Sequence, residues 1–175
     1  MLRLRADERF RFVFAGGGPL RADLEEFGRA NGLRLLAFRP YCAREELGNA
    51  LAEGDIGLVT QKPETLGCVV PSKTYGIMAA ARPVLFIGPR EATPARIIRR
   101  FDCGWQVDCG DTENLVALLR QLAEHPELIH SAGRRAREAF LARYDLPVGA
   151  GRICRILGAG SVLGEMAQAA AVRAV

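Results

Sequence analysis

The chain has 175 residues, a length typical of one domain with a buried core. Hydrophobic residues make up 49% and charged residues 25%, as in ordinary globular proteins. The net charge is +4, and no dense run of Lys and Arg with interleaved aromatics occurs, so the sequence disfavours a nucleic acid partner. A mild basic excess suits an anionic small ligand or an anionic membrane surface.

The five cysteines are odd in number and form no C-x-x-C pair, which disfavours a zinc site and a disulfide framework. Reduced thiols fit a cytoplasmic protein. Residues 1–14 alternate arginine with apolar residues and do not resemble a secretory signal. The longest apolar stretch, 77–87, is interrupted by Arg82 and Pro83 and is shorter than the roughly 20 residues that span a bilayer.

Strand-like and helix-like segments alternate along the chain. We expect strands over residues 10–15, 33–38, 55–60, 83–87 and 104–107. We expect helices over residues 20–31, 44–53, 72–81, 93–101, 111–125, 126–144, 148–157 and 162–175. This alternation predicts an α/β fold, in which helices cover both faces of a parallel sheet.

Local signals mark several helix ends. Leu20, Leu24 and Phe27 recur at helical spacing and predict one apolar face on the helix over 20–31. Turn and capping residues predict the ends of this helix and of three others: Gly32 as a stop, and Ser72, Thr93 and Asp111 as N-caps.

Ligands of parallel α/β sheets bind at the carboxyl ends of the strands. We call this edge the rim, and it is expected to comprise residues 16–19, 39–41, 61–73 and 88–93. Gly16, Gly17, Gly18 and Pro19 join a strand to a helix there, so the amides of this turn are placed to face an anion. A tight turn that needs positive φ explains the same glycines equally well. The pattern is not G-x-G-x-x-G, which disfavours a dinucleotide site.

The second candidate on the rim is the run Pro71, Ser72, Lys73 and Thr74, which opens a helix. Lys73 lies in the first turn, where a cation opposes the helix dipole. A phosphate bound by both Lys73 and the free amides would compensate this unfavourable position of the cation. We therefore favour an anion site over a solvated lysine.

Other polar residues offer weaker chemistry. His125 and His130 are five apart, which is the wrong spacing for two metal ligands on one helix face, and no metal site is predicted. Cys68 has no histidine near it in sequence, so a nucleophilic role is disfavoured. No catalytic residue is assigned.

Several runs, taken in order and spacing, resemble the C-terminal domain of GT-B glycosyltransferases, in the large retaining branch that includes colanic acid and O-antigen enzymes. These runs are F-x-F-x-G-x-G-P, L-A-E-G-D-I-G-L-V, V-V-P-S-K-T-Y-G-I-M-A-A-A-R-P-V-L, C-G-W-Q-V and A-G-R-R-A-R-E-A-F-L-A-R-Y-D. The resemblance covers residues 10–157.

The resemblance implies a Rossmann-like nucleotide-sugar-binding domain over residues 1–157, followed by a helical tail over residues 158–175. Its rim would hold a UDP- or GDP-linked sugar, and a separate N-terminal domain would hold a saccharide or lipid-linked acceptor of surface polysaccharide synthesis. Members of this kind need no metal, because helix amides and basic side chains neutralise the leaving diphosphate. The implied location is the cytoplasm, at the inner face of the membrane.

Three departures from the family pattern stand out. The family often has glutamates where this chain has Cys68 and Gly76, and a glycine where it has Ala81. The family's N-terminal domain and the first strand-helix unit of the C-terminal domain are missing. That strand normally lies mid-sheet, so its absence predicts a gap between the strands over 10–15 and 55–60. Those two strands then close together, or another chain fills the gap, or the chain is a fragment.

Three functions compete. The first is donor binding within a glycosyltransferase. The second is a non-catalytic module that binds a nucleotide sugar or a partner chain. The third is an unrelated α/β nucleotide-binding protein of epimerase-like type, which the run V-P-S-K-T-Y-G disfavours.

Overall fold

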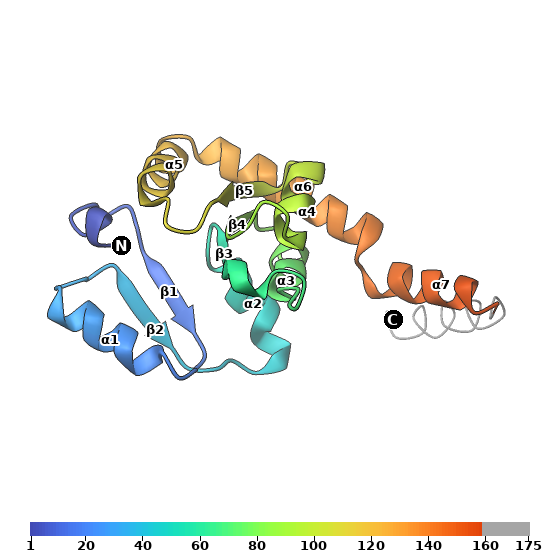
Figure 1. The fold of residues 1–175 in the computed structure, drawn as a ribbon, viewed down its shortest axis with the longest axis horizontal. Coiled ribbons are helices and arrows are strands. Elements are labelled where there is room, and N and C mark those ends of the chain that lie inside the picture. Colours follow the sequence, from blue (N-terminus) through green and yellow to red (C-terminus); the bar gives the residue numbers. More distant parts are fainter. Residues whose placement is uncertain (159–175) are drawn as a thin grey trace.

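A computed structural model describes residues 1–158 (Figure 1). The strands are β1 (Phe12–Ala15), β2 (Leu36–Arg39), β3 (Gly57–Thr60), β4 (Val84–Ile87) and β5 (Gly104–Val107). The helices are α1 (Arg21–Ala30), α2 (Leu47–Ala52), α3 (Lys73–Ala79), α4 (Thr93–Phe101), α5 (Thr112–Glu124), α6 (Pro126–Arg143) and α7 (Leu146–Ile156), and short 3-10 turns are η1 (Leu2–Leu4), η2 (Arg44–Glu46) and η3 (Pro63–Thr65). The predicted α/β alternation is confirmed, whereas the helix expected over 162–175 and the tail from residue 159 onward lie outside the described residues.

The predicted helix caps are only partly confirmed. Asp111 caps α5, because its carboxylate accepts a hydrogen bond from the Asn114 amide at 3.2 Å. Ser72 makes no capping bond, since its own backbone is already helical (φ −65°, ψ −24°) and a capping residue is usually extended. Thr93 is the first residue of α4, and the extended Ala92 before it is the N-cap. The sequence therefore predicts this N-cap one residue too late.

The strands form two parallel sheets, β1–β2 and β3–β4–β5. In the first sheet Phe12 pairs with Leu36, and in the second Val84 pairs with both Gly57 and Gly104. β1 and β3 are not paired with each other. The predicted gap between them is therefore present, and the alternative in which these two strands close together is excluded.

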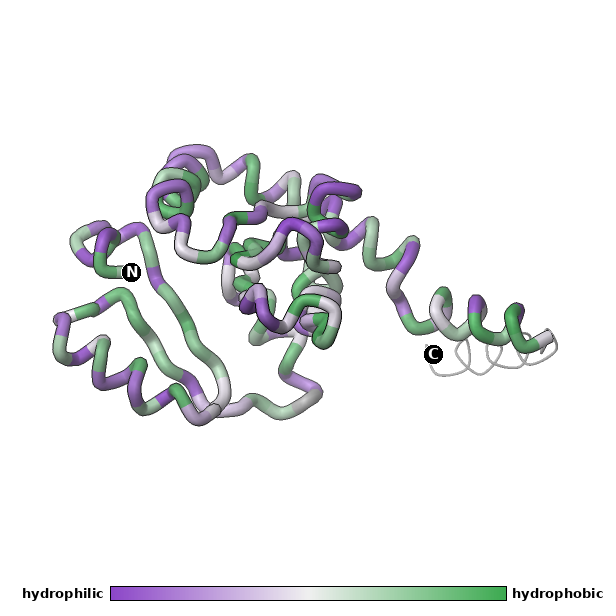
Figure 2. The backbone as a smooth tube through the Cα atoms, in the orientation of Figure 1, coloured by the Kyte–Doolittle hydropathy of each residue, from purple (hydrophilic) through white to green (hydrophobic). Residues whose placement is uncertain are grey.

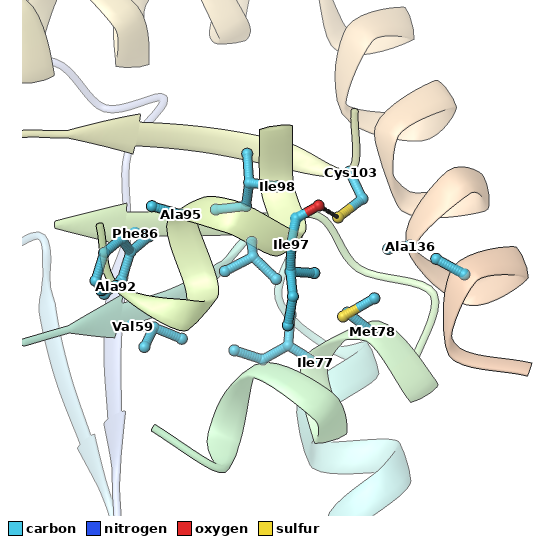
Figure 3. Packing of buried hydrophobic residues seen from close by; sticks show 12 residues of the cluster. Val59, Ile77, Met78, Phe86, Ala92, Ala95, Ile97, Ile98, Cys103 and Ala136 are labelled. Carbon is cyan, nitrogen blue, oxygen red and sulfur yellow. Dashed lines mark hydrogen bonds between the residues drawn. The ribbon is translucent and has the colours of Figure 1, made fainter. Parts of the chain in front are cut away.

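The larger core lies between the three-stranded sheet and helices α3, α4 and α6 (Figure 3). Apolar side chains from alternate strand positions, such as Val59 and Phe86, meet Ile77, Met78 and Ile97. Phe86 and Met78 are fully buried. Gly133 lets α6 approach this core closely, because an added Cβ would lie 2.4 Å from the Ala81 carbonyl oxygen.

A second apolar cluster joins the two sheets on the side of α5. Leu4 of the N-terminal turn is 1% exposed and packs with Leu35 beside the first sheet and with Leu85 of β4. Val116 and Leu119 of α5 complete this contact. The N-terminal turn therefore holds the two sheets together although no backbone ladder connects them.

Some apolar faces remain open. The stripe predicted on α1 is only partly covered, since Leu20 is 72% and Phe27 is 41% exposed. Helix α7 extends away from the sheets (Figure 1), and hydrophobic residues alternate with hydrophilic ones along it (Figure 2). Within residues 1–158, no helix combines the length and the apolar character that crossing a membrane requires.

Candidate functional site

The glycine turn after β1 lies on the rim and is shaped by positive φ. Gly16 has φ of 102° and Gly18 has φ of 150°, a backbone that side-chain-bearing residues rarely adopt. The ring of Tyr41 lies against this turn, and a Cβ added to Gly16 would approach the ring to 2.8 Å. The glycines thus allow an aromatic ring that is 78% exposed to rest on the backbone.

Arg21, the first residue of α1, fastens the ends of β1 and β2. Its guanidinium donates to the carbonyl oxygens of Gly16 and of Arg39, the latter at 2.8 Å. It also pairs with Glu25 at 2.7 Å and lies 5.7 Å from the ring centroid of Phe38. These contacts fix where the glycine turn leaves the sheet.

The second candidate, residues 71–74, lies at the start of α3. The side chains of Ser72 and Lys73 are exposed, and within residues 1–158 no ion pair involves Lys73. Thr74 is 1% exposed, so its side chain faces the interior while its backbone stays in the first turn. Lys73 is therefore a free cation on the rim, as an anion site requires.

Gln61 follows β3 and organises the loop that leads to Lys73. Its amide nitrogen donates to the carbonyl oxygens of Thr65 at 3.2 Å and of Val69 at 3.1 Å. Gln61 is 6% exposed, and its Oε1 has no hydrogen-bond partner in the described part of the chain; neither has the buried Oγ1 of Thr74. The rim thus retains buried polar atoms with free hydrogen-bonding capacity.

A third rim feature joins the ends of β4 and β5. Gln106 donates to the Gly88 carbonyl oxygen and to the Asp108 carboxylate, each at 2.8 Å. Arg90 pairs with the same carboxylate at 3.1 Å. The hydrogen bonds that Gln106 and Arg90 donate to Asp108 lower the pKa of this carboxyl group. The carboxylate therefore stays charged and forms an ion pair with Arg90.

The two predicted anion-binding segments come from different sheets. Gly16, Gly17 and Gly18 follow β1, whereas Pro71, Ser72, Lys73 and Thr74 follow the β3 loop. No hydrogen bond links the two segments in the described structure. The sequence interpretation missed Arg21 and Gln61, because their roles depend on carbonyl groups distant in sequence and no local pattern marks them.

The positions that depart from the family pattern are now placed. Cys68 is exposed in the loop before α3. A side chain at Gly76 would point toward Leu51 of α2, whose Cδ1 lies 3.4 Å from the position of an added Cβ. Over residues 1–158, His, Cys, Asp and Glu side chains form no group of three or more that could ligate a metal.

Comparison with known proteins finds no matching family model. Among curated proteins, the chain is 29% identical over 123 residues to the probable glycosyltransferase WbjE of Pseudomonas aeruginosa, a match that covers 70% of this chain and 31% of the relative. It is 31% identical over 138 residues to the sulfoquinovosyl transferase SQD2 of Arabidopsis thaliana, which covers 77% of this chain and 25% of the relative. It is 39% identical over 77 residues to the putative colanic acid biosynthesis glycosyl transferase WcaI of Escherichia coli K12, which covers 44% and 19%.

Solved structures show the same fold. The glycosyltransferase WaaG, involved in lipopolysaccharide biosynthesis, superimposes with a TM-score of 0.62 at 22% identity, over 82% of this chain and 37% of that one. The chain therefore has the fold of GT-B glycosyltransferases, and its sequence is similar to that of curated glycosyltransferases. It also matches TarM with a TM-score of 0.67 at 19% identity, over 82% of its length and 28% of TarM.

The GT-B match is partial in length. The chain spans 31%, 19% and 25% of the three curated relatives, and 37% and 28% of the two solved structures. The matched portion includes strands of both sheets, because more than four-fifths of this chain is superimposed.

Proposed function

We propose that this chain binds the donor in a glycosyltransferase that moves a sugar from a nucleoside diphosphate sugar to a saccharide or lipid-linked acceptor. The observation that carries this proposal is the exposed Lys73, which forms no ion pair within residues 1–158 and opens α3 after the loop that follows the parallel strand β3. Relatives that are named as glycosyltransferases support it.

The donor diphosphate is assigned to the side chain of Lys73 and to the amides of Ser72 and Lys73, with the turn at Gly17 and Gly18 facing the same ligand. Pro71 has no N–H to donate, and the amides of Thr74 and Gly16 already donate to the carbonyl oxygens of Pro71 and Arg39. A cation and free amides together neutralise a leaving diphosphate, so we expect no metal requirement. One solved relative of the fold, HepE of Anabaena, was crystallised with UDP-glucose, and it superimposes over 91% of this chain with a TM-score of 0.63. UDP-linked sugars are therefore the first donors to test, followed by GDP-linked sugars.

The experiment is calorimetry of UDP-glucose with the longer enzyme that contains this chain. A hydrogen bond to a charged group contributes about 1.5–3 kcal/mol, so Lys73→Ala should weaken binding roughly tenfold or more. Lys73→Arg keeps the charge and should retain most of the affinity. Arg143→Ala, at the end of α6, is the matched control for loss of one positive charge. Unchanged affinity in Lys73→Ala would refute the assignment, and loss of binding in EDTA would refute metal independence.

A non-catalytic binding module is the second candidate. It is favoured by the short match to each relative and by Cys68 and Gly76, which stand where the family often has glutamates. Donor binding without turnover in the longer protein would select this candidate over the first.

The acceptor side involves other surfaces. We propose that a further domain or another chain holds the acceptor. We also propose that the protein works in the cytoplasm at the inner face of the membrane, where the net charge of +4 favours anionic lipids. Sedimentation with vesicles that contain anionic lipid, and not with neutral vesicles, tests this location.

A further inference from the structure

A pocket lies at the edge of the second sheet that is opposite the rim. Asp55 precedes β3 and Arg82 precedes β4, so both lie at the amino ends of these parallel strands. His130 and Arg134 of α6 line the same pocket. Because the rim is formed at the carboxyl ends of the strands, this pocket and the proposed donor site lie at opposite ends of the sheet.

Close packing of α6 shapes the walls of the pocket. Its apolar lining consists of Ala81, Pro83 and Ile129. A Cβ added to Gly133 would lie 2.4 Å from the Ala81 carbonyl oxygen and 3.3 Å from Pro83 Cδ, so α6 is in direct contact with the chain before β4. The pocket has a volume of about 290 Å³. This is the share of roughly ten water molecules and lies at the small end of ligand pockets.

The charged groups that line the pocket do not neutralise one another. Within residues 1–158, no ion pair involves Asp55, Arg82 or Arg134. Asp55 and Arg82 begin neighbouring strands, but the Nη2 of Arg82 donates to the Ala52 carbonyl oxygen. The buried Nε of Arg82 has no acceptor in the described part of the chain. The pocket therefore holds a carboxylate and two guanidinium groups with unused hydrogen-bonding capacity.

The α6 side of the pocket is suited to a phosphate group. His130 and Arg134 are four residues apart on this helix, so they lie on the same face of it. Both are exposed, and neither forms an ion pair in the described structure. A guanidinium binds phosphate through two parallel N–H groups, and an imidazole supplies a further N–H.

Asp55 restricts what the rest of the ligand can be. A carboxylate repels a phosphate but accepts hydrogen bonds from hydroxyl groups. Asp55 lies on the strand side of the pocket and Arg134 on the α6 side. A ligand that spans the pocket therefore directs its phosphate to α6 and its hydroxyl groups to Asp55. A volume of roughly ten waters fits a small polyol ester and is too small for a nucleotide sugar.

We propose that this pocket binds a phosphate monoester of a small polyol. Arg134 and His130 hold the phosphate, and Asp55 accepts hydrogen bonds from the polyol hydroxyls. A phosphate monoester carries a charge of about −1.5 to −2 at pH 7, which offsets the two guanidinium groups of the pocket. This inference does not depend on the proposed donor site.

The test is calorimetry of glycerol phosphate with the 175-residue chain. Arg134→Ala removes charge-assisted hydrogen bonds and should weaken binding about tenfold or more. The variant should keep its fold, because Arg134 is exposed and forms no ion pair within residues 1–158. Arg143→Ala, which removes one positive charge from the same helix outside the pocket, is the matched control and should bind normally. An unaffected Arg134→Ala would overturn the inference.

Asp55→Ala tests the orientation of the ligand. It should weaken the binding of glycerol phosphate and not that of inorganic phosphate, because only the ester presents polyol hydroxyls to Asp55. Thermal melts check that the variant remains folded. An equal effect on both ligands, or no effect on either, would overturn the assigned role of Asp55.

Lys73→Ala separates this pocket from the proposed donor site. This variant should bind glycerol phosphate normally. Loss of binding in Lys73→Ala together with normal binding in Arg134→Ala would place the phosphate on the rim and overturn the inference. Arg134-dependent binding of glycerol phosphate in a protein that fails to bind UDP-glucose would refute the proposed function and leave the pocket assignment intact.

Soluble esters and lipid headgroups share this chemistry. Sedimentation with vesicles that contain phosphatidic acid, compared with neutral vesicles, distinguishes the two sources. Arg134-dependent sedimentation would identify a lipid headgroup as the ligand, whereas binding of glycerol phosphate without sedimentation would identify a soluble ester. Binding of neither probe would overturn the inference.

Discussion

Ala81 lies just beyond α3 with φ of 56°, in the left-handed region that favours glycine. The sequences that this chain resembles have glycine at this position, and a positive φ explains a preference for glycine there. A left-handed backbone costs a non-glycine residue about 1–2 kcal/mol. Ala81→Gly should therefore raise the free energy of unfolding by about 1 kcal/mol, less any gain of unfolded-state entropy.

Urea denaturation measures this change. Ala80→Gly is the matched control, because Ala80 has φ of −80° and no strain to relieve. This control should be neutral or destabilising. Equal stabilisation by both glycines would contradict the assignment of strain to Ala81.

Cys103 should be inert while the other thiols react. It is fully buried, its Sγ lies 3.9 Å from the Ile97 carbonyl oxygen (Figure 3), and burial raises the pKa of its thiol to about 11. The thiolate is the reactive form, so at pH 8 the native protein should be labelled at the exposed Cys42, Cys68 and Cys109 and not at Cys103. Peptide mapping by mass spectrometry checks this, with urea-unfolded protein as the fully labelled control. Rapid labelling of Cys103 in the native chain would contradict its burial.

At the scale of elements, α5 depends on its N-terminal cap. Asp111 accepts a hydrogen bond from the Asn114 amide, and Val116 and Leu119 of the same helix belong to the cluster that joins the two sheets. Loss of such a cap costs about 1 kcal/mol, so Asp111→Ala should lower the free energy of unfolding by that amount. Asp111→Asn retains an oxygen acceptor and should be near wild type in thermal and urea melts. An unaffected Asp111→Ala would show that the cap contributes no stability.

Elements themselves were largely predictable, and their ends less so. The segments over 93–101 and 104–107 have the predicted bounds. Ser72 failed as a cap, since its backbone already belongs to the helical turn set by the preceding Pro71 loop. Gln61 donates hydrogen bonds to Thr65 and Val69 within that loop, and no local sequence pattern marks these contacts.

At the scale of the whole molecule, the 175 residues alone should show no transferase activity. Under the proposed function this chain holds the donor, whereas a further domain or another chain holds the acceptor. Val13 of β1 and Leu58 of β3 are 47% and 40% exposed, and each of these strands has one edge that no described strand pairs with. Exposed apolar strand edges promote self-association. The purified chain should therefore melt with low cooperativity or sediment as a species larger than a monomer.

Assays of sugar release from UDP- and GDP-linked donors, with and without acceptor lipids, test this expectation alongside sedimentation velocity. Co-expression of the remaining part of a longer enzyme should restore turnover. Acceptor-dependent turnover by a stable monomer of this chain would contradict the claim.

The amino-acid sequence by itself determined the α/β class, the order of the elements and the two candidate turns at residues 16–18 and 71–74. These features depend on local periodicity, on glycine and proline, and on runs that resemble GT-B enzymes. Only the tertiary structure shows that β1 and β3 do not pair and that Leu4 packs between the two sheets. It also shows that Arg21 and Gln61 donate hydrogen bonds to backbone carbonyl oxygens of the rim. Strand pairing and side-chain bracing join residues far apart in the chain, and their free energy depends on which surfaces meet, which no local pattern specifies.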